Sequence, residues 1–429
     1  MKKPFKWDQY SDQPALLKDK IYKKKMRKSQ SLSLIKTSVL SLILMPISLL
    51  AMPFTKRKEI NSNHFFSLGI DFERDPSETL LLLKELDVSR LLLRVKLWEM
   101  EQLDVLENFI DHIEDKKITL KILQDRENIE DLKLLEKNLE IIFTKFHNKI
   151  EIFEIGSTIN RAKWGFFSVN EYLEFFRVAY RLKQEKFPNI KLMGSGVIDF
   201  EYHFTIHTLF NFSKIQYDAI AALLYVDRRG APENTQLGFT LSDKIAWLST
   251  LVWLSPKVEQ ELHITETNWP ISNTAPYAPT SEKECVSQNY YADYMLRYYL
   301  LAFASQQVDS VSWHQLIAPG YGLVDNRNGI EKRSAFYTYK YMIKILRDAQ
   351  FLRLDIKRDY YILQCLIDDA LLQIHWSLKD TTLKNEDFFE VYNKEGVIVK
   401  DKILNIGSSP LYIFITKEVG KSVNASERI

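Results

Sequence analysis

Two strand-like segments of this sequence end in residues whose types suit acid–base or nucleophilic chemistry. The apolar run Leu262–Thr265 ends in Glu266, and the run Ile150–Ile155 is followed by a polar turn that contains Ser157 and Thr158. A glycosidase requires two carboxylates, presented from different parts of the chain, on either side of the bond that it cleaves. Here one strand end supplies a carboxylate and the other supplies hydroxyls, so whether the chain is an enzyme depends on this difference.

Other polar and aromatic side chains follow the remaining strand-like segments. They are Arg94, Trp98, Gln124, Tyr225, Asp227, Trp269 and Trp313. Such a set suits a carbohydrate, because sugar hydroxyls need hydrogen-bond partners and aromatic faces cover the apolar side of a sugar ring. We therefore predict an oligo- or polysaccharide as the ligand. Core packing is the alternative for the three tryptophans, and a structural ion pair is the alternative for Arg94.

The elements that must position these residues alternate along the chain. Strand-like runs cover Phe65–Asp71, Leu91–Val95, Ile118–Leu123, Glu151–Ile155, Lys191–Gly194, Ala219–Tyr225, Leu262–Thr265 and Val308–Trp313. Helical periodicity follows each of them, over Ser77–Leu86, Leu103–Ile113, Ile129–Phe146, Val169–Leu182, Thr205–Phe212, Leu241–Leu254, Gln288–Phe303 and Ser334–Leu346. Eight such units predict a (β/α)8 TIM barrel, whose chemistry lies at the strand ends. A doubly wound α/β sheet would also alternate strands and helices, but the absence of a glycine-rich motif in the first turn favours the barrel.

The rest of the chain divides by composition. We predict a basic region over residues 1–36, a membrane segment over 37–53, the barrel over 62–348, a β-rich domain over 349–418 and a polar tail over 419–429. The strand candidates of the β-rich domain are Phe351–Ile356, Tyr360–Ile367, Leu371–Trp376, Phe388–Tyr392, Gly396–Val399 and Leu411–Ile415. Turn residues separate them, which indicates a small antiparallel domain.

The N-terminal region predicts a membrane location. A block of lysine and arginine residues precedes Thr37–Pro53, which carries no charge over 17 residues. This length is at the short end of a membrane span, and the preceding positive charge orients the segment with its N-terminus in the cytoplasm. The segment is either an uncleaved signal-anchor or a signal peptide that starts at Met26, and a buried helix of a soluble domain is the third alternative. Both membrane interpretations place the barrel outside the cytoplasm.

Bulk composition excludes several functions. The net charge is +2, which gives no footprint of nucleic-acid binding. Cys285 and Cys365 fit no metal-binding spacing, and the pair His203 and His207 has no carboxylate in register. The sequence contains no glycine-rich phosphate loop. We therefore expect no metal and no cofactor.

Four of these segments resemble glycoside hydrolase clan A, especially the β-xylosidase and α-L-iduronidase-like barrels with an appended β domain. They are LLLRV at Leu91–Val95, FEIGSTIN at Phe153–Asn160, HITETNWP at His263–Pro270 and VSWHQLIAPGYGLVD at Val311–Asp325. The resemblance covers about Phe65 to Ile415. It implies that Glu266 stands at the place of the catalytic nucleophile and Arg94 at the place of the family's strand-two arginine.

The chain departs from the family pattern at the centre of its strand-four motif. Ser157 takes the place of the asparagine that usually contacts the sugar, and Thr158 takes the place of the acid/base glutamate. A threonine hydroxyl does not titrate near neutral pH, and loss of general acid–base help costs ~10²–10⁴-fold in rate. Asp125 and Asp227 are possible substitutes, whereas Glu154 lies inside the strand at a different depth.

Three functions follow from this departure. The chain is a glycoside hydrolase or transglycosidase with a displaced acid, a catalytically inactive protein that binds an envelope glycan, or a scaffold in an envelope assembly.

Overall fold

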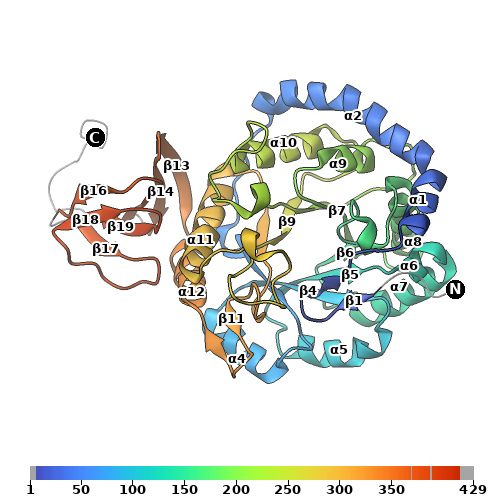
Figure 1. Cartoon of the computed structure of the whole chain (residues 1–429), viewed down its shortest axis with the longest axis horizontal. Helices are drawn as coiled ribbons and strands as arrows, with labels where there is room; N and C mark the ends of the chain where they lie inside the picture. The colour runs from blue at the N-terminus through green and yellow to red at the C-terminus, as the bar shows by residue number, and fades with distance from the viewer. Residues whose placement is uncertain (1–5, 369, 387–388, 416–429) are drawn as a thin grey trace.

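The computed structural model describes residues 6–368, 370–386 and 389–415, and its centre is a closed barrel of parallel strands (Figure 1). The strands are β3 (Phe66–Ile70), β4 (Arg90–Lys96), β5 (Lys117–Leu123), β6 (Ile152–Ile155), β7 (Lys191–Ile198), β8 (Ala219–Leu223), β9 (Leu262–Thr267) and β10 (Ser310–Trp313). The barrel closes where Val311 of β10 pairs with Phe66 of β3. The predicted (β/α)8 barrel is therefore confirmed.

A ring of helices surrounds the barrel. It comprises α4 (Pro76–Leu86), α5 (Leu103–Asp111), α6 (Arg126–Glu130), α7 (Leu132–Phe146), α8 (Val169–Glu185), α9 (Tyr202–Leu209), α10 (Leu241–Leu254), α11 (Gln288–Ser305) and α12 (Ser334–Leu346). The single helix predicted over Ile129–Phe146 is wrong, because Asp131 leaves the helical conformation and caps α7 by accepting hydrogen bonds from the N–H groups of Lys133 and Leu134. Short 3₁₀ turns and a hairpin lie in the connections: η2 (Met100–Gln102), η3 (Ala162–Trp164), η4 (Asp227–Arg229), η5 (Glu282–Glu284), β11 (Val324–Asp325) and β12 (Glu331–Lys332).

The side chains of each barrel strand alternate between two environments. Ile118, Leu120 and Ile122 of β5 belong to the large core shared with the helices, whereas Thr119 and Lys121 alternate with them and are buried on the other face. That inner face is polar. Lys121 forms an ion pair with Glu154 of β6 at 3.4 Å, and both side chains are at most 1% exposed. The barrel interior therefore holds charges directly beneath its mouth.

The C-terminal domain is an antiparallel β structure beside α11 and α12 (Figure 1). Its five-stranded sheet has the order β13 (Gln350–Lys357), β14 (Tyr360–Ile367), β15 (Ala370–Ser377), β19 (Leu411–Ile415) and β17 (Phe389–Tyr392). The strand predicted over Gly396–Val399 is wrong, since only an isolated bridge joins Ile398 to Tyr392. The predicted strands do not include β16 (Thr381–Lys384) and β18 (Ile403–Ile406), which pair with each other. The sequence TTLK of β16 lacks an apolar alternation. The predicted tail 419–429 lies outside the described residues.

The N-terminal region forms a hairpin and two helices. The hairpin pairs β1 (Trp7–Asp8) with β2 (Gln13–Pro14). The helices are α1 (Lys20–Ser29) and α2 (Ser31–Ala51), followed by η1 (Met52–Phe54) and α3 (Ser62–Phe65). By length and composition, Ser31–Phe54 is apolar enough to cross a membrane. In the structure α2 runs along the outer rim and packs on α9 and α10 (Figure 1).

Candidate functional site

Glu266 lies at the C-terminal end of β9, where a bulge directs its side chain. Ile264 pairs with Val311, but the next pair joins Thr267 to Trp313, so β9 contains one extra residue between the two pairs. Such a bulge changes the direction in which the side chains next to it point. Thr265 and Glu266 consequently both contact residues of the barrel interior, although they are neighbours in sequence.

Two groups hold the Glu266 carboxylate. The hydroxyl of Tyr225 donates a 2.7 Å hydrogen bond to Oε1, and the ammonium of Lys121 lies 3.9 Å from Oε2. Burial alone would raise the pKa of Glu266, but His314, Lys121 and the hydrogen bond from Tyr225 outweigh it and lower that pKa. Burial also lowers the pKa of His314 to about 4, which leaves the ion pair with Lys121 and the hydrogen bond from Tyr225 as the contacts that stabilise the carboxylate at neutral pH. Glu266 is therefore ionised at neutral pH, as a nucleophile must be.

Tyr225 is itself fixed in place. The guanidinium of Arg229 lies 3.6 Å from the centroid of the Tyr225 ring. Burial raises the pKa of Tyr225 well above its ordinary value, with a further contribution from the negative charge of Glu266. Tyr225 therefore keeps its proton and remains a donor to the carboxylate.

Thr158 lies in the loop after β6 and cannot act as a titrating acid. It is 1% exposed, and its Oγ1 lies 3.3 Å from the Oγ of Ser157. Its backbone has φ 52°, in the left-handed region that β-branched residues rarely adopt. Gln124 holds this turn, because its Oε1 accepts from the Ser157 N–H and its Nε2 donates to the Ser157 carbonyl. Gln124 is therefore engaged with the protein backbone.

The carboxylates of Asp125, Asp227 and Glu154 lie near the mouth, and each has a different environment. Asp125 caps α6, accepting from the backbone and side-chain nitrogens of Asn128 at 2.9 and 2.8 Å. Asp227 begins η4 and has a buried Oδ1 without a hydrogen-bond partner among the described residues. Burial, opposed by Lys121, raises the pKa of Glu154 to about 7. Glu154 therefore holds a proton more readily than an ordinary carboxyl, but Lys121 contacts both Glu154 and Glu266 from one ammonium group.

The N-terminal hairpin covers the mouth of the barrel. Asp12 forms a buried ion pair with Arg94, and the side-chain amide of Gln315 lies 3.4 Å from the same carboxylate oxygen. The ring of Trp7 packs against Trp98, with 5.2 Å between centroids. Two predicted ligand-contacting residues, Arg94 and Trp98, are therefore occupied by the protein's own chain.

A second set of contacts fastens the hairpin to the loops of the mouth. Gln13 accepts a 2.5 Å hydrogen bond from Lys163 and donates to the carbonyl of Pro279 at 3.1 Å. Trp7 also meets Trp164 edge-on at 5.8 Å. Burial lowers the pKa of Lys163, although the charge of Glu266 acts in the opposite direction. The hairpin therefore bridges loops that follow β6 and β9.

The tryptophan after β9 and the one that ends β10 are buried. Trp269 and Trp313 stack on each other with 5.9 Å between centroids, and they are 1% and 0% exposed. The indole nitrogen of Trp313 donates to Tyr291, and that of Trp269 donates to the Arg229 carbonyl. Contact of these rings with a sugar stays a prediction that requires the surrounding loops to move.

Sequence reasoning missed Lys121 and Asp12. The sequence does contain a signal for Lys121. Apolar and polar residues alternate in KITLKIL, and the alternation places Lys121 on the face of the strand that lies inside the barrel. No local pattern marks Asp12, whose partner Arg94 lies 82 positions further along the chain.

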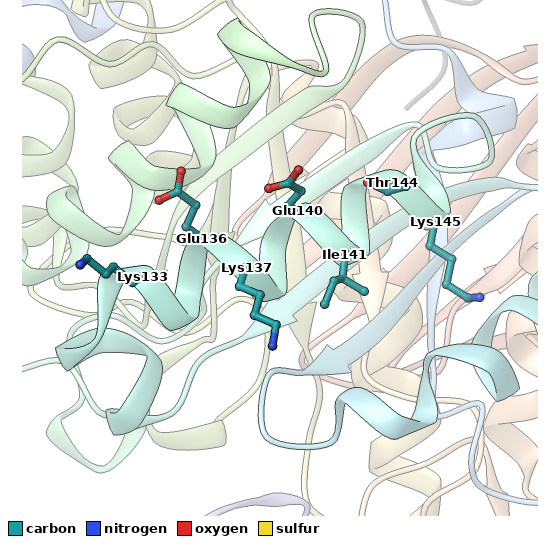
Figure 2. Close-up of a pocket in the computed structure, with 7 residues that line it drawn as sticks. All are labelled: Lys133, Glu136, Lys137, Glu140, Ile141, Thr144 and Lys145. Atoms are coloured by element: carbon teal, nitrogen blue, oxygen red, sulfur yellow. The ribbon is translucent and has the colours of Figure 1, made fainter.

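An open hollow elsewhere on the surface lies over α7 (Figure 2). Its lining consists of residues of one outer helix face: Lys133, Glu136, Lys137, Glu140, Ile141, Thr144 and Lys145. Its two glutamates form ion pairs with residues at the C-terminal end of α8, Glu136 with Arg181 and Glu140 with Lys186. This hollow is a solvated part of the helical ring, away from the barrel mouth. Among the described residues no cluster of histidine, cysteine, aspartate and glutamate could hold a metal ion.

No protein-family model and no curated protein matches the sequence. Solved structures do match the fold. A family 39 glycoside hydrolase from the gut symbiont Bacteroides cellulosilyticus WH2 has a TM-score of 0.65 at 14% identity, over 84% of this chain and 82% of that one. A family 39 β-xylosidase from Caulobacter crescentus has a TM-score of 0.54 at 12% identity, over 84% and 98%. A family 51 arabinofuranosidase from Xanthomonas axonopodis pv. citri has a TM-score of 0.56 at 11% identity, over 84% and 97%.

These structures define the class of fold. The predicted resemblance to clan A glycoside hydrolases is confirmed at the level of architecture, a parallel eight-stranded barrel with a C-terminal antiparallel β domain. At such low identity the likeness concerns the fold, and the activity has to be argued from the site.

Proposed function

We propose that this protein binds a glycan at the mouth of its barrel and that Glu266 can attack the anomeric carbon of a bound sugar. The observation that carries this proposal is the ionised Glu266 carboxylate, which receives a 2.7 Å hydrogen bond from Tyr225 at the C-terminal end of a barrel strand. The named activities of the similar structures, on xylosides and arabinofuranosides, suggest pentose-containing glycans as the first to test.

The missing acid limits the chemistry. When a Glu266 oxygen forms a bond to the anomeric carbon, the leaving oxygen departs with the bonding electron pair, and it needs a proton unless it is stable as an anion. Thr158 cannot supply that proton. We therefore expect reaction with aryl glycosides whose phenolate leaves unprotonated, followed by slow attack of water on the glycosyl ester.

The experiment is a screen of full-length protein against aryl glycosides of pentoses and hexoses with activated leaving groups. A burst of phenolate, with the sugar recovered on the peptide that contains Glu266, supports the proposal. Glu266→Ala should abolish the burst. Tyr225→Phe should weaken it, because the carboxylate loses one donor while the barrel keeps its shape. If none of the aryl glycosides labels Glu266, the assignment of Glu266 as the nucleophile is contradicted.

A second function, glycan binding without catalysis, is favoured by the lack of a carboxylate at Thr158. The buried Asp12–Arg94 pair and the packing of Trp7 on Trp98 cover the mouth with the protein's own hairpin, so a glycan that binds there must displace the hairpin. A binder would retain oligosaccharides in an equilibrium assay in both the wild type and Glu266→Ala, whereas no sugar would accumulate on the protein.

For location, we propose attachment to a membrane of the cell envelope through the N-terminal apolar helix. The support is the length and composition of Ser31–Phe54 together with the basic helix that precedes it. The charge pattern predicts a position of the barrel outside the cytoplasm on the condition that this helix spans the membrane or acts as a signal peptide. Recovery of full-length protein without membranes after fractionation would contradict the attachment.

A further inference from the structure

Helix α2 turns its polar side to the protein and its apolar side to the surroundings. Its buried residues are Ser33, Thr37, Ser41 and Ser48. Its large apolar side chains on the opposite side are between 49% and 77% exposed: Leu32, Ile35, Val39, Leu42, Ile43, Ile47 and Leu50. A surface helix of a protein in water has the reverse arrangement. Lys36 is the one exposed charged residue of α2. An apolar stripe of this kind marks contact with another apolar phase.

Specific hydrogen bonds join the polar side of α2 to the helical ring. Thr37 Oγ1 lies 2.7 Å from Nδ1 of His207 on α9. The indole nitrogen of Trp247 on α10 donates to Ser48 Oγ at 2.8 Å. Two more bonds fasten the N-terminal end, from Asn170 N–H to Ser33 and between Ser168 and Gln30. The helix is therefore docked lengthwise on the barrel, as Figure 1 also shows.

The chain on both sides of α2 belongs to the same body. Before it, the hairpin Trp7–Pro14 lies on the barrel mouth through the pair Asp12–Arg94. After it, β3 begins the barrel itself at Phe66. A helix of 21 residues is about 31 Å long, so if it spanned a bilayer its two flanks would lie on opposite sides. The hairpin contacts require both flanks on one side.

Positive charge lies next to the apolar stripe. Helix α1, with the sequence KIYKKKMRKS, contains six lysine and arginine residues and no acid, and none of its residues is buried. It leads into α2 through Gln30. An exposed cationic helix joined to an exposed apolar face suits a surface that offers both anionic groups and hydrocarbon, which is the interface of an anionic bilayer.

We propose that α2 lies in the plane of an anionic membrane, with its apolar stripe in the interface and α1 against the headgroups. The barrel is then docked on the membrane through the side that carries α9 and α10, and the N-terminus stays on the same side as the barrel. This arrangement differs from a signal-anchor, which would place the hairpin across the membrane from the barrel. It does not depend on the glycosidase activity proposed above.

Vesicle flotation with purified full-length protein tests the binding. Vesicles of phosphatidylcholine with phosphatidylglycerol should carry the wild type, and neutral vesicles should carry at least tenfold less. The double variant Leu42→Glu, Ile43→Glu should lose at least tenfold in bound fraction at an unchanged unfolding temperature. The matched control is Ser38→Glu, an exposed position of α2 outside the apolar stripe. Failure of the wild type to float, or equal flotation of the double variant, would overturn the proposal.

Labelling with a membrane-impermeant maleimide tests the topology. In a Cys285→Ser background, with the buried Cys365 retained, Gln9→Cys reports on the hairpin and Lys137→Cys reports on the outer face of α7. In sealed membrane vesicles from expressing cells, an in-plane α2 gives both positions the same accessibility. Labelling of one position with protection of the other would establish a spanning helix and refute the in-plane arrangement.

Discussion

Replacing Asp12 by asparagine should open the barrel mouth. The carboxylate of Asp12 is buried against Arg94, and both side chains are less than 8% exposed. Asparagine keeps the size of the side chain but removes its charge, so the buried guanidinium loses its nearest charged partner and keeps neutral acceptors, among them Gln315 at 3.4 Å. The closed position of the hairpin therefore loses its main electrostatic support.

The size of this effect follows from the burial of the pair. Removing one partner of a buried ion pair costs about 3–5 kcal/mol, because an uncompensated charge remains. At about 1.4 kcal/mol for each factor of ten, the ratio of closed to open hairpin should fall by about 10²- to 4 × 10³-fold. The packing of Trp7 on Trp98, about 0.5–1.5 kcal/mol, is unchanged and opposes full release.

Two assays measure the opening independently of each other. Hydrogen exchange of residues 6–15 should accelerate in Asp12→Asn, and labelling of Glu266 by an activated aryl glycoside should become faster. Asp115→Asn is the control, since it removes a carboxylate that is 70% exposed on the far loop after α5. Unchanged exchange in the hairpin of Asp12→Asn would refute the argument that this ion pair closes the mouth, whatever the glycoside assay gives.

Three further outcomes are expected. Thr158→Glu should raise steady-state turnover of aryl glycosides, up to the ~10²–10⁴-fold typical of general acid–base catalysis, and adding Glu266→Ala should abolish the gain. If Thr158→Glu gives no gain when combined with Asp12→Asn, the loop that carries residue 158 does not reach the leaving group. Burial raises the pKa of Glu154 in the folded protein to about 7, so the folded protein binds more protons than the unfolded chain between about pH 4.5 and 7. The free energy of unfolding, measured in urea, should therefore fall by about 3 kcal/mol as pH rises through that range. Glu154→Gln should flatten this pH dependence. Burial lowers the pKa of His207 to about 4, so the docking of α2 through Thr37 should weaken as pH falls from 6.5 toward 4. Amide exchange in α2 should then become faster at low pH in the wild type, and this effect should disappear in His207→Gln. An identical pH dependence in that variant would exclude His207 as the cause.

The barrel could be predicted because its signals are local. Each barrel strand is a short apolar run of a length that a buried parallel strand requires, and the helices after them keep a 3.6-residue period. The prediction failed where these signals are weak. Short polar strands such as β16 depend on their partner β18 for hydrogen bonds, and the capping aspartate at Asp131 interrupts a helix whose apolar period continues.

The position of Glu266 was predicted from the same signals, whereas its environment was not. Its place after an apolar strand puts it at the catalytic end of any such barrel. Its ionisation depends on Lys121 and Tyr225, which come from two other strands and meet it only when the barrel closes. The bulge that turns Glu266 inward is also a property of the pairing between β9 and β10, not of either segment alone.

The sequence by itself determined the order of strands and helices, the apolar N-terminal helix, the carboxylate at position 266 and the absence of one at Thr158. Those features depend on residue type and on periods of two to four residues, which act within a single element. The tertiary structure alone decided that the N-terminal hairpin lies on the mouth and that α2 buries four hydroxyl side chains while large apolar side chains such as Leu42 and Leu50 stay exposed. These outcomes depend on pairs far apart in sequence, Asp12 with Arg94 and Thr37 with His207, whose ion pair and hydrogen bond form only after the barrel has brought their partners to its surface.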